Sequence, residues 1–143
     1  MRIICWKEYF SNLVFLSFTQ KVLNVSSHGR FTNPPSRASA WRYGFDTPAD
    51  YDDNGNNCGG FSNQWNRAGG KCGICGDDWY ADPREHEAPG GLYATGTIVN
   101  SYSAGQTIPV TIEITANHWG HFEFKLCANN DVTKDPKQDC FDK

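Results

Sequence analysis

The sequence lacks several features that mark common classes of protein. Its longest apolar stretch, Leu13 to Phe18, is far shorter than the roughly 20 residues that a membrane-spanning helix needs. Positive charge is not in excess, because 13 Lys and Arg stand against 16 Asp and Glu, a net charge of −3. Such a balance gives no support to a nucleic-acid or anionic-membrane partner. Internal repeats and a convincing 3.6-residue apolar period are also missing, so we expect a core of β-strands.

The first 27 residues have the pattern of a secretory signal peptide. Arg2 and Lys7 make the start positive, residues 13–18 form a short apolar core, and residues 25–27 are small enough for a signal peptidase site. The alternative is a short buried strand at the start of the domain. We expect cleavage after residue 27, which leaves His28 as the first residue of a secreted chain.

The remainder, residues 28–143, is long enough for one domain and no more. Residues 1–27 carry a net charge of +2, so this remainder is at −5. We expect a secreted, extracellular monomer with no nucleic-acid and no membrane partner.

Five cysteines follow residue 27, and in a secreted chain they predict a disulfide framework. They are Cys58, Cys72, Cys75, Cys127 and Cys140. Because five is odd, we expect one of them to be free or to have its partner beyond Lys143. A zinc site made by Cys72 and Cys75 with His118 and His121 is a competing interpretation. Secretion argues against zinc, because these thiols would be oxidised.

Alternating apolar residues predict strands at residues 94–102, 106–115 and 121–127. Residues 28–57 are expected to be rich in loops, with a turn at Asp52 to Gly55. Short strands, many turns and disulfides predict an all-β fold, an antiparallel β-sandwich of the immunoglobulin or fibronectin III type with long disulfide-held loops. The polar tail after residue 127 lacks the closing strands of such a sandwich, so we expect the domain to be incomplete at its C-terminus.

Two histidines suggest chemistry. His118 lies on the predicted connection between two strands, at a sheet rim where a rigid scaffold can present a side chain. An N-terminal His28 would offer its α-amino group and its imidazole Nδ1 to the same metal ion. The amine pKa is only about 7.7–8.0, so the neutral form is accessible near physiological pH. Three nitrogens in one plane, two from His28 and one from His118, favour copper(II).

Three other polar residues near these positions have competing interpretations. His121 is either a residue at the surface or just outside the metal ligands, or a ligand itself. Glu123 either tunes the metal environment from outside the ligands or is an ordinary exposed strand residue. His86 is flanked by charged residues, so we expect a solvated loop histidine.

The motifs together resemble one known family. Three stretches carry the resemblance: His28-Gly29, the cysteine–glycine block from Cys58 to Asp77, and the block from Ala116 to Cys127. They resemble the lytic polysaccharide monooxygenases with a chitin-binding type-4 domain, in the branch found in insects and other invertebrates. The resemblance spans nearly all of residues 28–140.

That resemblance implies a "histidine brace", in which His28 and His118 hold one copper ion as ligands and catalytic residues. It implies oxidative cleavage of a crystalline β-1,4-linked polysaccharide. Chitin is the first candidate substrate and cellulose is the second. Hydrogen peroxide or dioxygen serves as co-substrate, with an external reductant. Ala116 matches the small residue that restricts one axial face of the copper. The family's axial Tyr or Phe has no counterpart in this chain, which puts catalysis in doubt.

Three hypotheses therefore stand side by side. The chain is a secreted copper monooxygenase, or a module of the same family that binds chitin without chemistry, or a generic secreted disulfide domain in which His28 and His118 never meet.

Overall fold

The computed structural model describes residues 28–117, 122 and 124–142. The predicted signal segment therefore lies outside the described residues. Within the described ranges, no helix has the length and apolar character to cross a membrane.

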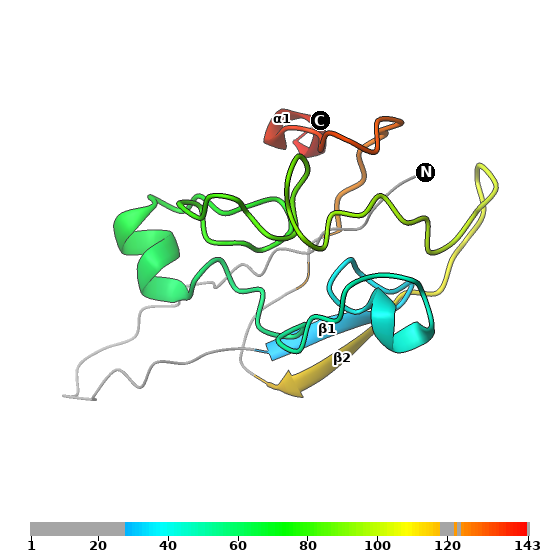
Figure 1. Cartoon of the computed structure of the whole chain (residues 1–143), viewed down its shortest axis with the longest axis horizontal. Helices are drawn as coiled ribbons and strands as arrows, with labels where there is room; N and C mark the ends of the chain where they lie inside the picture. Colours follow the sequence, from blue (N-terminus) through cyan, green and yellow to red (C-terminus); the bar gives the residue numbers. More distant parts are fainter. Residues whose placement is uncertain (1–27, 118–121, 123, 143) are drawn as a thin grey trace.

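Two antiparallel strands form the sheet. Strand β1 is His28–Asn33 and strand β2 is Thr111–Ala116. His28 faces Ala116 and Phe31 faces Ile112, with irregular register between His28 and Gly29 and again near the far end of β1. The sheet runs along one side of the molecule, with the long loops stacked beside it and the C-terminal tail farthest away (Figure 1).

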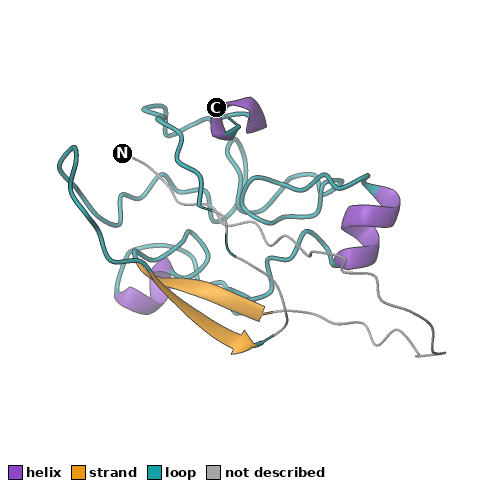
Figure 2. Cartoon of the chain, turned by 180° about the vertical axis from the view of Figure 1, so that it is seen from behind, coloured by secondary structure: helices purple, strands orange, loops and turns teal. Residues whose placement is uncertain are grey.

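Loops make up most of the chain (Figure 2). The helical elements are short: the 3-10 helix η1 at Ala40–Tyr43, the π-helix η2 at Ser62–Arg67 and the helix α1 at Gln138–Phe141. Residues 94–102 form no strand, so that prediction is wrong, and the strand expected at 106–115 is shortened to β2. A strand was also predicted at residues 121–127. The residues of this range that the structure describes, 122 and 124–127, do not form a strand.

Residues 28–57 are rich in loops, as predicted, and strand β1 is an element within them that the sequence did not predict. Only Phe31 supplies an apolar side chain at a strand position, and it is 1% exposed. Its ring meets that of Phe124 edge to face, with centroids 6.1 Å apart. The strand forms because pairing with β2 and burial of one aromatic ring outweigh a weak local pattern.

Cross-links and small residues dominate the interior. Besides Phe31, the buried apolar residues are Ala38, Ala40, Ala68, Cys58, Cys72, Cys75 and Cys127. Disulfides join Cys58 to Cys72 and Cys127 to Cys140. Cys75 is also disulfide-bonded, and no described cysteine is free. Because the other four cysteines after residue 27 pair with one another, Cys75 is the odd one of these five. The zinc interpretation fails, because Cys72 and Cys75 are disulfide-bonded and are not thiolates.

Buried ion pairs hold the loops to the sheet. The carboxylate of Asp53, whose side chain is 1% exposed, accepts a hydrogen bond from Arg30 at 2.8 Å and another from Arg42. Arg30 also reaches Glu113 across the strand pair at 2.7 Å. In the tail, Asp135 takes two hydrogen bonds from Arg37, at 2.5 and 2.6 Å. Charge-assisted, forked contacts of this kind fix geometry where the described residues bury few large apolar side chains.

His86 is buried, at 5% exposure, so the expectation of a solvated loop residue is wrong. Its Nδ1 contacts Asp77 at 2.8 Å, its Nε2 contacts Asp50 at 3.0 Å, and its ring stacks on Tyr93. Burial alone would lower the pKa of His86, but the hydrogen bonds and charges of Asp50 and Asp77 outweigh it and raise the pKa to about 9. The imidazolium therefore joins two carboxylates at neutral pH.

We predict that Asp53→Asn lowers the free energy of unfolding by roughly 2–4 kcal/mol, because the buried carboxylate balances two guanidinium groups. The matched control is Asp142→Asn, which weakens the exposed pair of Asp142 with Lys125 at 2.8 Å. An exposed pair contributes at most about 1 kcal/mol, so the control should change little. Urea denaturation monitored by circular dichroism measures both. Equal effects for the two variants would contradict the assignment.

We also predict that stability falls as the pH rises from about 6.5 towards 9. The pKa of His86 is raised on folding, so its contribution is complete below the unfolded value near 6.5 and is lost as the pH passes about 9. The total loss is of the order of 3 kcal/mol. Thermal melts between pH 6 and 9.5 should show this slope in the parent chain and a much flatter profile in His86→Gln. The same slope in both proteins would exclude His86 as its source.

Candidate functional site

His28 opens strand β1, directly across the sheet from Ala116. Its side chain is half-buried, and its Nδ1 atom is buried without a hydrogen-bond partner. A buried polar atom left unpaired costs about 1–3 kcal/mol, so such an atom calls for a specific explanation. Nδ1 is the nitrogen that an N-terminal histidine uses, together with its α-amino group, to chelate a metal. The orphaned atom thus fits a ligand that the protein alone does not provide.

Ala116 is half-buried and ends strand β2. Its methyl side chain faces the start of β1, so little bulk stands opposite His28. His118, His121 and Glu123, the other residues expected at the site, lie outside the described residues. The structure therefore brings together two of the expected site residues, His28 and Ala116.

A loop next to the sheet contributes contacts that the sequence did not suggest. The backbone oxygen of Asn54 accepts a hydrogen bond from the Gly29 N–H at 3.1 Å, and its Nδ2 donates to Thr115 Oγ1 at 2.8 Å. In the sequence, Asn54 carries only a turn signal, and the predicted turn is present, with Gly55 N–H bonded to Asp52 O at 2.8 Å. No local pattern could have shown that this turn lies against both strands.

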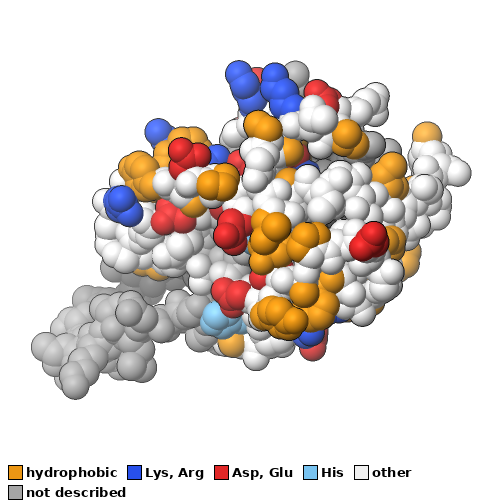
Figure 3. Space-filling view, in the orientation of Figure 1, with side chains coloured by type: hydrophobic (Ala, Val, Ile, Leu, Met, Phe, Trp, Pro, Cys, Tyr) orange, Lys and Arg blue, Asp and Glu red, His pale blue; other side chains and the backbone are white. Residues whose placement is uncertain are grey.

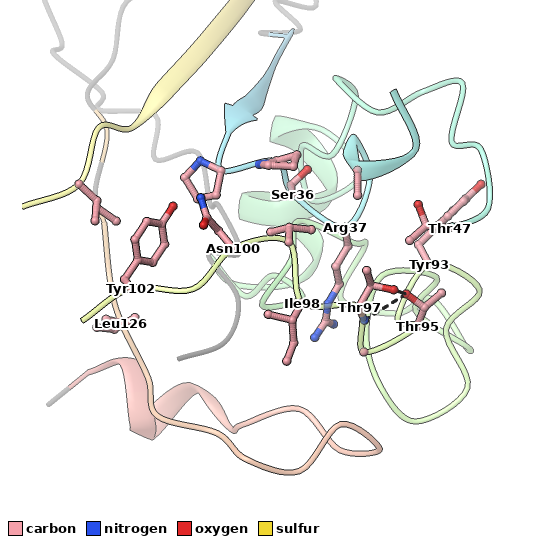
Figure 4. A pocket seen from close by; sticks show the side chains of 16 residues that line it. Ser36, Arg37, Thr47, Tyr93, Thr95, Thr97, Ile98, Asn100, Tyr102 and Leu126 are labelled. Atoms are coloured by element: carbon pink, nitrogen blue, oxygen red, sulfur yellow. Dashed lines mark hydrogen bonds between the residues drawn. The ribbon is translucent and has the colours of Figure 1, made fainter. Parts of the chain in front are cut away.

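Two pockets among the described residues lie away from His28. One apolar pocket lies between the turn at Ser36 and the extended segment from Tyr93 to Tyr102 (Figure 4). Its volume of about 60 Å³ is well below the roughly 300–1,000 Å³ of small-molecule sites. A larger, open hollow of about 770 Å³ lies beside Trp65 and Trp79. There Arg84 and Lys71 stack on the Trp79 ring, at 4.5 and 5.3 Å from its centroid, so the ring is already engaged.

Charge is mixed over the surface. The face in Figure 3 carries apolar side chains interspersed with acidic ones, and Lys and Arg gather mainly towards its upper and left edges. Among the described residues, no group of three or more His, Cys, Asp or Glu side chains is arranged to hold a metal ion.

Comparisons with known proteins identify the family. A model of a family described as "Lytic polysaccharide mono-oxygenase, cellulose-degrading" matches residues 28–143. Among solved structures, a lytic polysaccharide monooxygenase AA15 from Thermobia domestica, in the Cu(I) state, is 50% identical with a TM-score of 0.75. The match covers 80% of this chain and 59% of that protein. Comparison with curated proteins gives no match.

The structural match confirms the predicted all-β class, because the antiparallel strands, long loops and disulfides are those of the monooxygenase β-sandwich. The family match extends over all of residues 28–143 and begins at the histidine whose Nδ1 is left unpaired. This chain belongs to the lytic polysaccharide mono-oxygenase family.

Proposed function

We propose that this chain is a secreted, copper-dependent enzyme that cleaves a β-1,4-linked polysaccharide oxidatively, with chitin as the first candidate and cellulose as the second. One observation carries the proposal: His28, where the family match begins, has a buried and unpaired Nδ1 atom at the edge of the sheet. The related protein from Thermobia domestica was solved in the Cu(I) state, which supports copper as the metal.

The ligand set follows from the chain's own chemistry. Cleavage of residues 1–27 would free the α-amino group of His28, and with it one nitrogen beside Nδ1. The third nitrogen comes from His118, which follows Ala116 by two residues. Because two residues of chain span at most about 7 Å, the pairing of His28 with Ala116 supports a shared site.

Three nitrogens and no thiolate favour copper(II), which also has the highest affinity among the divalent first-row ions. Bound copper supplies the redox chemistry with hydrogen peroxide or dioxygen. The residues of this chain would have three tasks. The amine and imidazole of His28 would hold the ion at the sheet edge, His118 would supply the third nitrogen, and the methyl group of Ala116 would restrict access to one side of the ion. A site at a sheet rim can approach a polymer locked in a crystal, whereas a concave pocket cannot admit one.

We predict that the secreted protein with His28 at its N-terminus binds one copper(II) ion, with an axial electron paramagnetic resonance signal from three nitrogens. One extra residue before His28 removes the free amine and should weaken binding strongly. His118→Ala should weaken it by more than the roughly 10- to 100-fold that outer-shell changes cause. Calorimetric titration gives the affinities. Equal affinity in the parent chain and both variants would refute the ligand set.

We further predict that the protein releases oxidised oligosaccharides from chitin, or from cellulose, when copper, a reductant and hydrogen peroxide are supplied. His118→Ala should lose this release and still adsorb to the polymer, because adsorption uses the surface around the site. Mass spectrometry of soluble products and a pull-down assay separate the two activities. Adsorption without products in the parent chain would instead support a non-catalytic binding module.

A further inference from the structure

The two strand ends that carry the proposed site are held by a residue outside the sheet. Asn54 contacts both: its backbone oxygen accepts from Gly29 N–H at 3.1 Å and its side-chain Nδ2 donates to Thr115 Oγ1 at 2.8 Å. Gly29 adjoins His28, and Thr115 adjoins Ala116. One residue thus connects the start of β1 to the end of β2.

The sheet itself is irregular at this point. The register shifts between His28 and Gly29, so the regular ladder is interrupted beside the proposed ligand. Bulges of this kind occur next to active sites, where they redirect a side chain and leave a backbone group without its ladder partner. Here the Gly29 N–H, which is buried, finds its acceptor in Asn54 instead. The loop replaces a contact that the ladder lacks.

The loop that carries Asn54 is itself held by ion pairs, to strand β1 through Asp53 and to His86 through Asp50. Asp53 binds Arg30 of β1 at 2.8 Å, and Arg30 also reaches Glu113 of β2 at 2.7 Å. Earlier in the loop, Asp50 binds the buried His86 at 3.0 Å. These contacts leave the backbone next to Asn54 little freedom, so the Asn54 side chain meets β2 from a rigid support.

We propose that Asn54 is a positioning residue for the copper site, which sets the separation of the two strand ends that supply His28 and, two residues after Ala116, His118. The proposal rests on the proposed function, because it presupposes that these histidines share a metal. In the described contacts, the Asn54 side chain does not touch His28, and Asn54 acts through Gly29 and Thr115.

The test is copper(II) affinity and the electron paramagnetic resonance spectrum of the secreted protein with a verified His28 terminus. Asn54→Ala removes the hydrogen bond to Thr115, and we expect about tenfold weaker copper binding and altered copper hyperfine splitting. Thr115→Val removes the same bond from the other side and should have the same effect. The double variant should be no worse than either single one, because one interaction is lost. Thr115→Ser keeps the hydroxyl and should retain the parent affinity.

The matched control is Thr32→Val. Thr32 Oγ1 donates to Thr111 O at 3.3 Å at the far end of the same strand pair, so this variant also removes one hydrogen bond between the strands. We expect it to change thermal stability and leave copper affinity unchanged. Weakened copper binding in Thr32→Val equal to that in Thr115→Val would reduce Asn54 to a merely structural role.

The failure of this inference and the failure of the proposed function are separable. A parent protein that binds no copper tightly overturns the proposed function. A parent that binds one ion tightly, with unchanged affinity and spectrum in Asn54→Ala and Thr115→Val, overturns the role of Asn54 alone. If Asn54→Ala does not fold, the comparison of Thr115→Val with Thr115→Ser still decides.

Discussion

The pairing of β1 with β2 is the constraint on which the rest of the molecule depends. It joins residues 83 positions apart, such as Arg30 and Glu113, and it places the start of the described chain beside the end of β2. Every segment between these strands must leave the sheet and return to it. Since closing so long a loop has an entropic cost that grows only slowly with length, long connections are tolerated, provided that they are anchored.

Polar contacts supply that anchoring. The described interior contains few large apolar side chains, and buried Asp50, Asp53 and His86 stand where a larger domain would have aliphatic residues. Such groups are expensive to desolvate, but a satisfied network of them admits few alternative arrangements. The molecule thus combines irregular backbone with well-defined geometry, a combination suited to presenting a metal site on loops and strand ends.

The sequence predicted some of this and missed the rest for physical reasons. Ile112 and the threonines around it have a strand pattern, and β2 is there, because alternation is a local property. Strand β1 has Phe31 as its one inward apolar residue, so its strand character arises from a partner that no local window contains. Residues 94–102 have a similar strand-like pattern, but they have no ladder partner among the described residues and form no strand.

The candidate site divides in the same way. His28 and Ala116 were predicted from residue chemistry and from the family resemblance, and the structure sets them opposite each other. His118, His121 and Glu123 remain predictions outside the described residues. Asn54 could not be predicted, because its role depends on a turn meeting two strand ends. Burial of His86 was missed because charged sequence neighbours suggested solvent, whereas its actual partners come from Asp50 and Asp77.

The shared carboxylate of Asp53 has a consequence for how this chain can vary among species. Arg30 and Arg42 both depend on it, and Arg30 depends in addition on Glu113. Residues within one such network do not contribute additively, so the effect of changing one is set by the state of the others. Substitution at any of these four positions is tolerated best when its partners change with it. Relatives should therefore inherit the four as a set, and their covariation would trace this anchor through the family.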